Sequence, residues 1–280
     1  MLGRHGEYPG IPAGRIEFNG EYLKWVIIGL TREAGWYNVP HMNRYFAIIP
    51  AAGSGARLGS PVPKQYLTIE GRTLLDLSVS ALLAEPRIGR VYVVIARDDD
   101  RYTPDPERVA AGKIVVLRCG GATRADSVLN GLQAAALDAG DRVLVHDAAR
   151  PCLLASAVGR LIDEVGDDPN GGLLAIPVAD TLKRADGDQR VTATESRVSL
   201  WQAQTPQLFP CGVLLEALLS GDRSMITDEA SAVERLGLRP RLVTGDYSNL
   251  KVTYPGDLAW AGALLNASSD PERKPLREHT

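Results

Sequence analysis

From Met42 onward, short apolar runs alternate with longer segments of helical period. Several of the runs are almost continuous in Val, Ile and Leu, as expected of strands covered on both faces. The predicted strands are residues 45–50, 90–96, 113–117, 142–146, 172–178 and 239–244. The predicted helices are residues 73–84, 124–139, 155–165, 211–220 and 228–236, with a last one after Pro255. This alternation predicts an α/β fold with a mostly parallel, doubly wound, Rossmann-like sheet and helices on both faces.

Three segments depart from this rhythm. Residues 180–205 form two polar, β-branched arms around Asp186-Gly187-Asp188, which predicts a protruding β-hairpin arm at about residues 178–204. Residues 1–41 mix Gly, Pro, aromatic and charged residues without a sustained period, so they are left as an unassigned N-terminal extension, and Met42 is a candidate start. We expect one domain over residues 42–267 and a flexible tail over residues 268–280.

Composition narrows the functional class. At 280 residues and 45% hydrophobic content, the chain can build a substantial core. The formal net charge of -3 gives no global basic field, so we expect no nucleic-acid partner. Three cysteines match no zinc or redox spacing and leave an odd thiol, which favours a reducing cytoplasm. No apolar run is long enough for a membrane span, so we expect a cytoplasmic protein without a membrane partner.

The first candidate site is the glycine loop at residues 50–59, directly after the first strand. Its small residues let backbone N–H groups approach a phosphate closely. No Gly-Lys-Ser/Thr follows, and the third glycine, Gly59, is one place late for a dinucleotide fingerprint. A tight connection remains the simple alternative. Arg57 and Lys64 shift the balance, because two cations on one glycine loop favour a polyphosphate ligand.

Seven motifs in order then resemble the 2-C-methyl-D-erythritol 4-phosphate cytidylyltransferase family. They are Ala51-Ala52-Gly53-x-Gly55-x-Arg57 with Pro63-Lys64-Gln65-Tyr66, Arg124-Ala125-Asp126-Ser127-Val128, Val145-His146-Asp147-Ala148-Ala149-Arg150-Pro151, Pro177-Val178-x-Asp180-Thr181-Leu182-Lys183, Gln204-Thr205-Pro206-Gln207, Thr227-Asp228-Glu229-Ala230 and Asn249-x-Lys251-Val252-Thr253. The motifs span roughly residues 45–265. The resemblance implies a Rossmann-like nucleotidyltransferase of isoprenoid precursor biosynthesis, which joins CMP from CTP to 2-C-methyl-D-erythritol 4-phosphate and releases pyrophosphate.

The resemblance also assigns catalytic roles. Arg57 and Lys64 are expected to stabilise the triphosphate, and Lys251 is expected to lie near the α-phosphate. The attacking phosphate monoester is already mostly a dianion at neutral pH, so no side chain is needed as a general base. Charge neutralisation is then the main catalytic task. Without the motif, Lys251 would be read as a solvated charge at a strand end.

For the nucleotide, the resemblance implies a pocket built from eight residues. They are Ala51, Ala52, Gly53, Gly55, Gly121, Ser127, Asp147 and Ala148. Asp147 follows a predicted strand and is the candidate contact to Mg²⁺, directly or indirectly, because Mg²⁺ on a triphosphate needs one or two protein carboxylates or none. His146 lacks metal-spaced partners and is expected to be packed or hydrogen-bonded. Ala122 departs from the acidic or polar residue of many relatives, so a side-chain contact to the base is in doubt there.

For the second substrate, the resemblance implies contacts from Thr181, Arg197, Thr205 and Thr227. Thr181 and Arg197 lie on the predicted arm, which in the family crosses a two-fold axis and completes the partner's site, so a homodimer is expected. A solvated hairpin is the alternative interpretation, since charged arms are normal there too. Asp228 also fits an N-cap, although Ser231 is expected to be too short to complete a capping box.

Three alternatives remain open. A cytidylyltransferase for ribitol 5-phosphate would keep the glycine loop, Arg57, Lys64 and Asp147 but change the arm's pocket. A non-catalytic nucleotide-binding domain would not need to retain Arg57, Lys64 and Lys251. A nicotinamide-binding oxidoreductase fits least, because its ribose acid is missing. The chain is also expected to lack a fused downstream synthase, and thus to be monofunctional.

Overall fold

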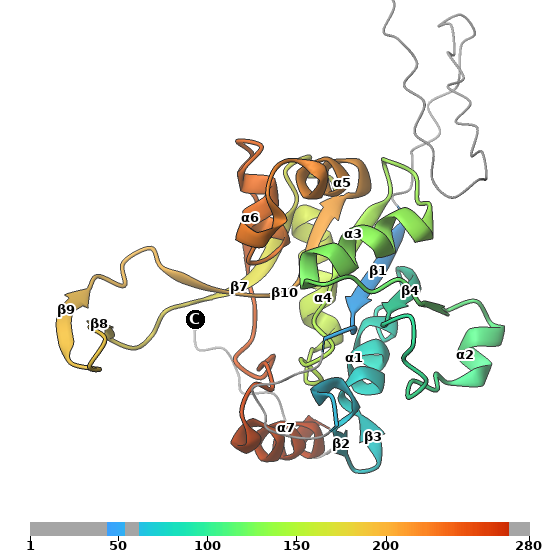
Figure 1. Ribbon diagram of the computed structural model, residues 1–280, viewed down its shortest axis with the longest axis horizontal. Helices are drawn as coiled ribbons and strands as arrows, with labels where there is room; N and C mark the ends of the chain where they lie inside the picture. The colour runs from blue at the N-terminus through green and yellow to red at the C-terminus, as the bar shows by residue number, and fades with distance from the viewer. Residues whose placement is uncertain (1–43, 54–61, 269–280) are drawn as a thin grey trace, which may run out of the picture. The chain divides into compact units, whose positions relative to one another are not determined.

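A seven-stranded sheet organises the computed structural model, which describes residues 44–53 and 62–268 (Figure 1). The strand order is β11-β7-β10-β6-β1-β4-β5, and β10 alone runs antiparallel to its neighbours within this sheet. The strands are β1 (Tyr45–Pro50), β4 (Ile88–Val94), β5 (Ile114–Leu117), β6 (Arg142–Val145), β7 (Gly172–Pro177), β10 (Trp201–Pro210) and β11 (Arg241–Thr244). The predicted mostly parallel α/β sheet is therefore confirmed.

Helices cover both faces of this sheet. They are α1 (Leu74–Leu83), α3 (Arg124–Ala135), α4 (Ala155–Val165), α5 (Cys211–Leu219) and α6 (Glu229–Glu234), whereas α7 (Pro255–Ser268) joins a separate apolar cluster with Ile69, Leu74 and Leu77. Ala47 and Ile49 of β1 join a core cluster with α1 and α4, whereas Ile48 joins a second cluster with α3, α5 and α6. This division follows from the two-residue period of a strand. The doubly wound arrangement is confirmed.

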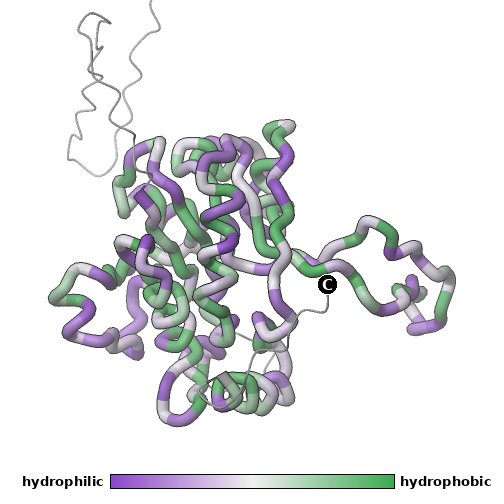
Figure 2. Tube along the Cα trace, turned by 180° about the vertical axis from the view of Figure 1, so that it is seen from behind, coloured by the Kyte–Doolittle hydropathy of each residue, from purple (hydrophilic) through white to green (hydrophobic). Residues whose placement is uncertain are grey.

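The predicted arm is a separate two-stranded antiparallel sheet, formed by β8 (Leu182–Ala185) and β9 (Val191–Glu195). It extends from the end of β7 and returns to the start of β10 (Figure 1). Hydrophobic and hydrophilic positions are mixed along it (Figure 2). The strand β7 of the main sheet, by contrast, is buried at all but its last residue. Val191 and Val198 on this arm are 64% and 80% exposed, so its apolar side chains have little to pack on within one chain.

The strand β10 is the main element that the sequence pattern did not predict. Its first residues, from Trp201, fall within the range predicted for the arm, yet they pair with β7 in the main sheet. Its sequence contains a proline and several glutamines and so does not show the pattern of a buried strand. Pro in particular is normally excluded from a central strand. Pro206 lies where the pairing of β10 with β7 is interrupted, between Ala203 and Gln207.

The remaining differences are small. The helix predicted over residues 124–139 ends at Ala135, because Ala136 adopts a left-handed conformation with φ of 49°. The short elements η2 (Lys64–Tyr66), β2 (Thr68–Ile69), β3 (Arg72–Thr73), α2 (Pro106–Ala110) and η3 (Arg223–Met225) were not predicted. Among the described residues, no helix has the length and apolar content that crossing a membrane requires.

Candidate functional site

A cavity of about 580 Å³ opens where three parallel strands end. Its walls come from the segments that follow β1, β5 and β6, together with η2 and the segment after β11. The residues that line it are Pro50, Ala51, Ala52, Gly53, Lys64, Gln65, Gly121, Ala122, Thr123, Arg124, Ser127, Asp147, Ala148, Ala149, Lys251 and Thr253. Open α/β sheets hold their ligands at this edge, so the cavity is the candidate site.

The start of the glycine loop is fixed by Gln65. This side chain is 4% exposed, and its Nε2 donates to the carbonyl of Ala51 at 2.8 Å and to that of Gly53 at 3.0 Å. The next residue, Tyr66, donates its hydroxyl to Asp99 at 2.8 Å. Lys64 is thus held beside the loop by two buried neighbours. No role was predicted for Gln65, although it stands in the quoted motif.

The opposite wall depends on two glycines. A Cβ on Gly120 would lie 2.3 Å from the Cβ of Ala52, and one on Gly121 would lie 2.4 Å from the Cβ of Asp126. Only residues without a side chain let this segment approach the loop and α3 so closely. The Oγ of Ser127 accepts a hydrogen bond from the Gly121 N–H at 3.0 Å. Ser127 therefore shapes the backbone of this wall.

Asp147 is surrounded by cations. One of its oxygens is 2.9 Å from Nε of Arg124, and the other is 2.8 Å from Nζ of Lys251. Nε of Arg150 lies 3.7 Å from the second oxygen. Burial raises the pKa of Asp147, but the charges of Arg124, Lys251 and Arg150 outweigh burial and hold its pKa well below the usual range. The carboxylate is therefore ionised at neutral pH.

Arg124 also binds Glu229, at the start of α6. Its two terminal nitrogens lie 2.6 and 3.0 Å from the two Glu229 oxygens. Burial lowers the pKa of Arg124, but the charges of Glu229 and Asp147 outweigh burial and raise it. Glu229, Arg124, Asp147 and Lys251 thus form one chain of alternating charges, of which Arg124, Asp147 and Lys251 line a wall of the cavity. Such a wall favours a polyanionic ligand.

A chain of hydrogen bonds supports Asp147 from behind. The Asp147 N–H donates to Oγ1 of Thr205 at 3.0 Å, and Oγ1 lies 3.0 Å from Nδ1 of His146. Nε2 of His146 lies 3.2 Å from the carbonyl of Arg150. Because a carbonyl only accepts, Nε2 carries the proton and Nδ1 accepts from the Thr205 hydroxyl. Burial lowers the pKa of His146 to about 4, so the ring is neutral. The expected hydrogen-bonded role of His146 is confirmed.

The comparisons with known proteins agree with this geometry. The profile of the family described as "IspD: 2-C-methyl-D-erythritol 4-phosphate cytidylyltransferase" matches residues 45–267. The chain belongs to this family. The enzyme of that name from Dechloromonas aromatica is 56% identical over 228 residues, which cover 81% of this chain and 99% of the relative. The Azoarcus sp. enzyme of the same name is 56% identical over 225 residues, 80% of this chain and 94% of its own.

Solved structures of the family have the same fold. A crystal structure of 4-diphosphocytidyl-2C-methyl-D-erythritol synthase matches with a TM-score of 0.70 and 41% identity, covering 80% of this chain and 99% of that one. The Francisella tularensis enzyme matches with a TM-score of 0.67 and 33% identity, covering 79% of this chain and all of that one. The predicted family resemblance is confirmed over the region that contains the cavity.

The cavity of this cytidylyltransferase brings together most of the predicted site residues that the structure describes. They are Ala51, Ala52, Gly53, Lys64, Gly121, Ser127, Asp147, Ala148 and Lys251. Arg57 and Gly55 lie outside the described residues. Of the cavity's other side chains, Arg124 and Thr253 had been quoted within motifs but given no role. Their contribution became visible only when the strands placed distant segments side by side.

None of the residues predicted for the second substrate lines this cavity. Thr181 and Arg197 are exposed on the segments that lead to and from the β8–β9 sheet, where a guanidinium N–H of Arg197 donates to the carbonyl of Ala179. Thr227 is exposed before α6, and Thr205 is buried behind Asp147. Their substrate roles remain predictions. One chain alone does not gather these four side chains.

The cap of α6 differs from the sequence-based expectation. Ser231 was expected to be too short for a capping box, yet its Oγ accepts from the Asp228 N–H at 3.2 Å. The Asp228 carboxylate in turn accepts from the Ser231 N–H at 2.9 Å. That expectation was wrong because a serine hydroxyl reaches the N-cap amide when the backbone of the first turn is close.

The residues of this cavity fit the predicted Mg²⁺ as an ion that a triphosphate carries. Within residues 44–53 and 62–268, no three acidic, histidine or cysteine side chains meet as a metal site. Asp147 is the carboxylate that lines the cavity, and cations already occupy both of its oxygens. A metal bound directly to Asp147 would share its oxygen with Arg124 or Lys251. The donor set therefore suits an ion bound by phosphate oxygens and water.

Proposed function

We propose that this chain transfers CMP from CTP to 2-C-methyl-D-erythritol 4-phosphate, giving 4-diphosphocytidyl-2-C-methyl-D-erythritol and pyrophosphate. Family membership supports this activity, and the observation that carries it is the cavity itself. Glycine-lined backbone and the cations Lys64 and Lys251 converge there at the carboxyl edge of the sheet. This combination suits a nucleoside triphosphate.

In the proposed reaction, a phosphate oxygen of the second substrate attacks the α-phosphorus of CTP in line. The bond from the α-phosphorus to the bridging oxygen of the β-phosphate breaks, and pyrophosphate leaves with that electron pair. Lys251 neutralises charge at the α-phosphate, while Lys64 and Arg57 neutralise charge on the leaving phosphates. The substrate's own phosphate is the nucleophile, so no protein base is assigned.

The nucleotide is proposed to lie against Ala51, Ala52 and Gly53 on one side and against Gly121 and Ser127 on the other. Gly121 adds no side chain to this wall, and Ala122 contributes only a methyl group. Backbone groups therefore carry recognition of cytosine. Asp147, Ala148 and Gly55 complete the nucleotide site.

We assign Mg²⁺ to the triphosphate, and Asp147 would be the carboxylate of the chain nearest to it. When bound, the ion would neutralise charge on the phosphates. The contribution of the chain's own residues is to keep Asp147 ionised and fixed in place, through Arg124, Lys251 and the N–H contact to Thr205.

The arm is proposed to make a homodimer and to complete the partner's acceptor site with Thr181 and Arg197. The exposed apolar side chains of the arm support this proposal, because a second copy would cover them. Thr205 and Thr227 are assigned to the acceptor side within each chain. Thr205 contributes through its contacts to Asp147 and His146.

A mixing experiment tests both the chemistry and the exchange of arms. Lys64→Ala and Arg197→Ala are each expected to be nearly inactive in pyrophosphate release from CTP and the methylerythritol phosphate. In a mixed dimer, the Arg197→Ala protomer supplies an intact Lys64, and the arm of the Lys64→Ala protomer supplies an intact Arg197 to the same site. Such a dimer therefore has one complete site. Random mixing should then restore about a quarter of the wild-type rate. No recovery would contradict the exchange, and near-normal activity of Lys64→Ala alone would contradict the catalytic assignment.

A further inference from the structure

The buried carboxylate of Glu229 lies just behind the cavity wall. It is 1% exposed and does not line the cavity, yet it binds both terminal nitrogens of Arg124, which does line it. Arg124 is thereby left with Nε for Asp147, at 2.9 Å from one oxygen. The other oxygen of Asp147 faces Lys251 at 2.8 Å.

The position of Glu229 is fixed from both sides. Gln207 of β10 is 1% exposed; its Nε2 donates to the Asp228 carboxylate at 2.8 Å and its Oε1 accepts from the Ala230 N–H at 2.8 Å. The capping box of Asp228 and Ser231 closes the same turn. Both chain neighbours of Glu229, Asp228 and Ala230, are thus bound by Gln207 of the central strand β10. Such an arrangement holds a side chain in one geometry.

We propose that Glu229 is a positioning residue of the active site, which holds Arg124 so that Asp147 divides its two oxygens between Arg124 and Lys251. A guanidinium prefers to bind a carboxylate with two parallel N–H groups. Without the Glu229 charge, the freed nitrogens of Arg124 turn to the nearest carboxylate, which is Asp147. Arg124 then takes both Asp147 oxygens, and Lys251 loses its partner and its place beside the α-phosphate.

This inference rests on the proposed role of Lys251, and it predicts a kinetic signature. Glu229→Gln keeps the shape of the side chain but removes its charge and opposes an amide N–H to the guanidinium. We expect kcat to fall by about tenfold or more, with a smaller change in the KM for CTP, because Lys251 acts mainly in the transition state. The effect should largely disappear in a Lys251→Ala background, since the two changes act through one contact.

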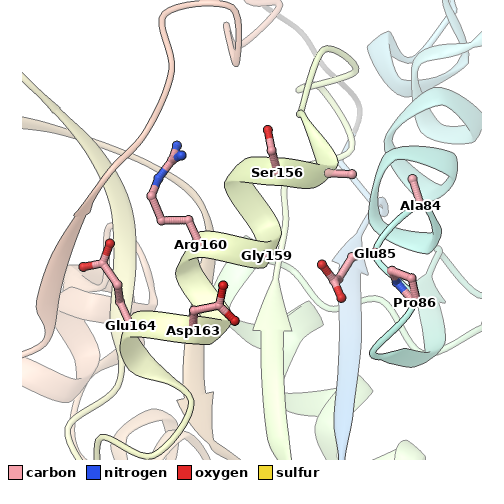
Figure 3. Close-up of a pocket in the computed structure, with 9 residues that line it drawn as sticks. Ala84, Glu85, Pro86, Ser156, Gly159, Arg160, Asp163 and Glu164 are labelled. Carbon is pink, nitrogen blue, oxygen red and sulfur yellow. The ribbon is translucent and has the colours of Figure 1, made fainter. Parts of the chain in front are cut away.

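Glu85 provides a matched control. It is also a buried glutamate held by an arginine, with Nε of Arg87 2.7 Å and a terminal nitrogen 3.2 Å from its oxygens. Glu85 lies before β4 and faces α4 across a different cavity (Figure 3), at the sheet edge opposite the candidate site. Glu85→Gln therefore tests the loss of a buried glutamate charge away from the catalytic centre. We expect it to keep the wild-type kcat.

The experiment measures pyrophosphate release and thermal unfolding for wild type, Glu229→Gln, Lys251→Ala, the double variant and Glu85→Gln. Wild-type turnover of CTP tests the proposed function separately. Three results would each overturn the positioning role. One is a wild-type kcat for Glu229→Gln, and another is an equal fall of kcat in Glu85→Gln. The third is a fall of kcat on Glu229→Gln that is as large in the Lys251→Ala background as in the wild type. If Glu229→Gln fails to fold, Arg124→Lys is measured in its place. A lysine ammonium cannot bind the carboxylates of Glu229 and Asp147 together as the guanidinium does. The kcat of this variant should fall in the same Lys251-dependent way, and a normal kcat would overturn the proposal.

Discussion

Acidification should destabilise this protein through His146. The ring is fully buried, donates Nε2–H to the Arg150 carbonyl and accepts the Thr205 hydroxyl at Nδ1. Protonation of Nδ1 would remove that acceptor and place a charge in the core. Burial accordingly lowers the pKa of His146 to about 4 in the folded state, against about 6.5 for an unperturbed histidine.

The direction follows from linkage. The unfolded chain binds the proton as pH falls through about 6.5, whereas the folded chain binds it only near pH 4. Stability is therefore fully present above pH of about 6.5 and is lost as pH falls toward 4. Between pH of about 7.5 and about 5, the two pKa values correspond to a loss of about 2 kcal/mol of unfolding free energy.

Urea unfolding at several pH values measures this loss. His146→Gln keeps a donor to the Arg150 carbonyl but has no titrating group in this pH range. Its absolute stability is not the readout, since the substitution also changes packing. We expect the unfolding free energy of wild type to fall by about 2 kcal/mol more than that of the variant over this range. Equal pH dependence of the two proteins would refute the assignment of a buried, neutral His146.

Three further predictions address the site and its support. A Cβ on Gly53 or on the control residue Gly140 would meet nothing within 4 Å, so both alanine variants should fold normally. Gly53→Ala alone should raise the KM for CTP, by about tenfold or more, because its methyl group blocks the nucleotide. An unchanged KM would contradict the position of the loop. Asp228→Ala should cost about 1 kcal/mol in urea unfolding, as expected for a lost N-cap, and a loss within error would contradict that role. A chelator should abolish turnover without lowering the melting temperature, since the described residues form no metal cluster, and a lower melting temperature would indicate a structural metal.

Most of the fold could be predicted because its strands are buried on both faces. The apolar runs of β1 and β4 have no competing interpretation, and the helices between them begin close to where the period changes. The strand β10 was not predicted because Gln204 and Gln207 interrupt its apolar pattern. Their side chains hydrogen-bond to the carbonyl of Asp246 and to the N-cap of α6 instead of packing in an apolar core. A strand whose side chains hold the site in place does not show the pattern of a core strand.

The candidate site was predictable in its parts but not in its connections. The motifs located Lys64, Asp147 and Lys251, and these line one cavity. The ion pairs that hold Asp147 join residues far apart in the chain: Asp147 pairs with Arg124, which in turn pairs with Glu229, 105 positions away. Such pairs leave no local periodicity, so only the folded chain shows which cation meets which carboxylate.

The most direct test of cytidylyl transfer is ³¹P NMR of a reaction with purified protein, CTP, Mg²⁺ and one polyol phosphate at a time. With 2-C-methyl-D-erythritol 4-phosphate, the monoester signal should be replaced by two coupled diphosphate signals as an equal amount of pyrophosphate forms. Ribitol 5-phosphate should remain unchanged under the same conditions. Preferential consumption of ribitol 5-phosphate, or hydrolysis of CTP without a new diphosphate, would contradict the proposed function.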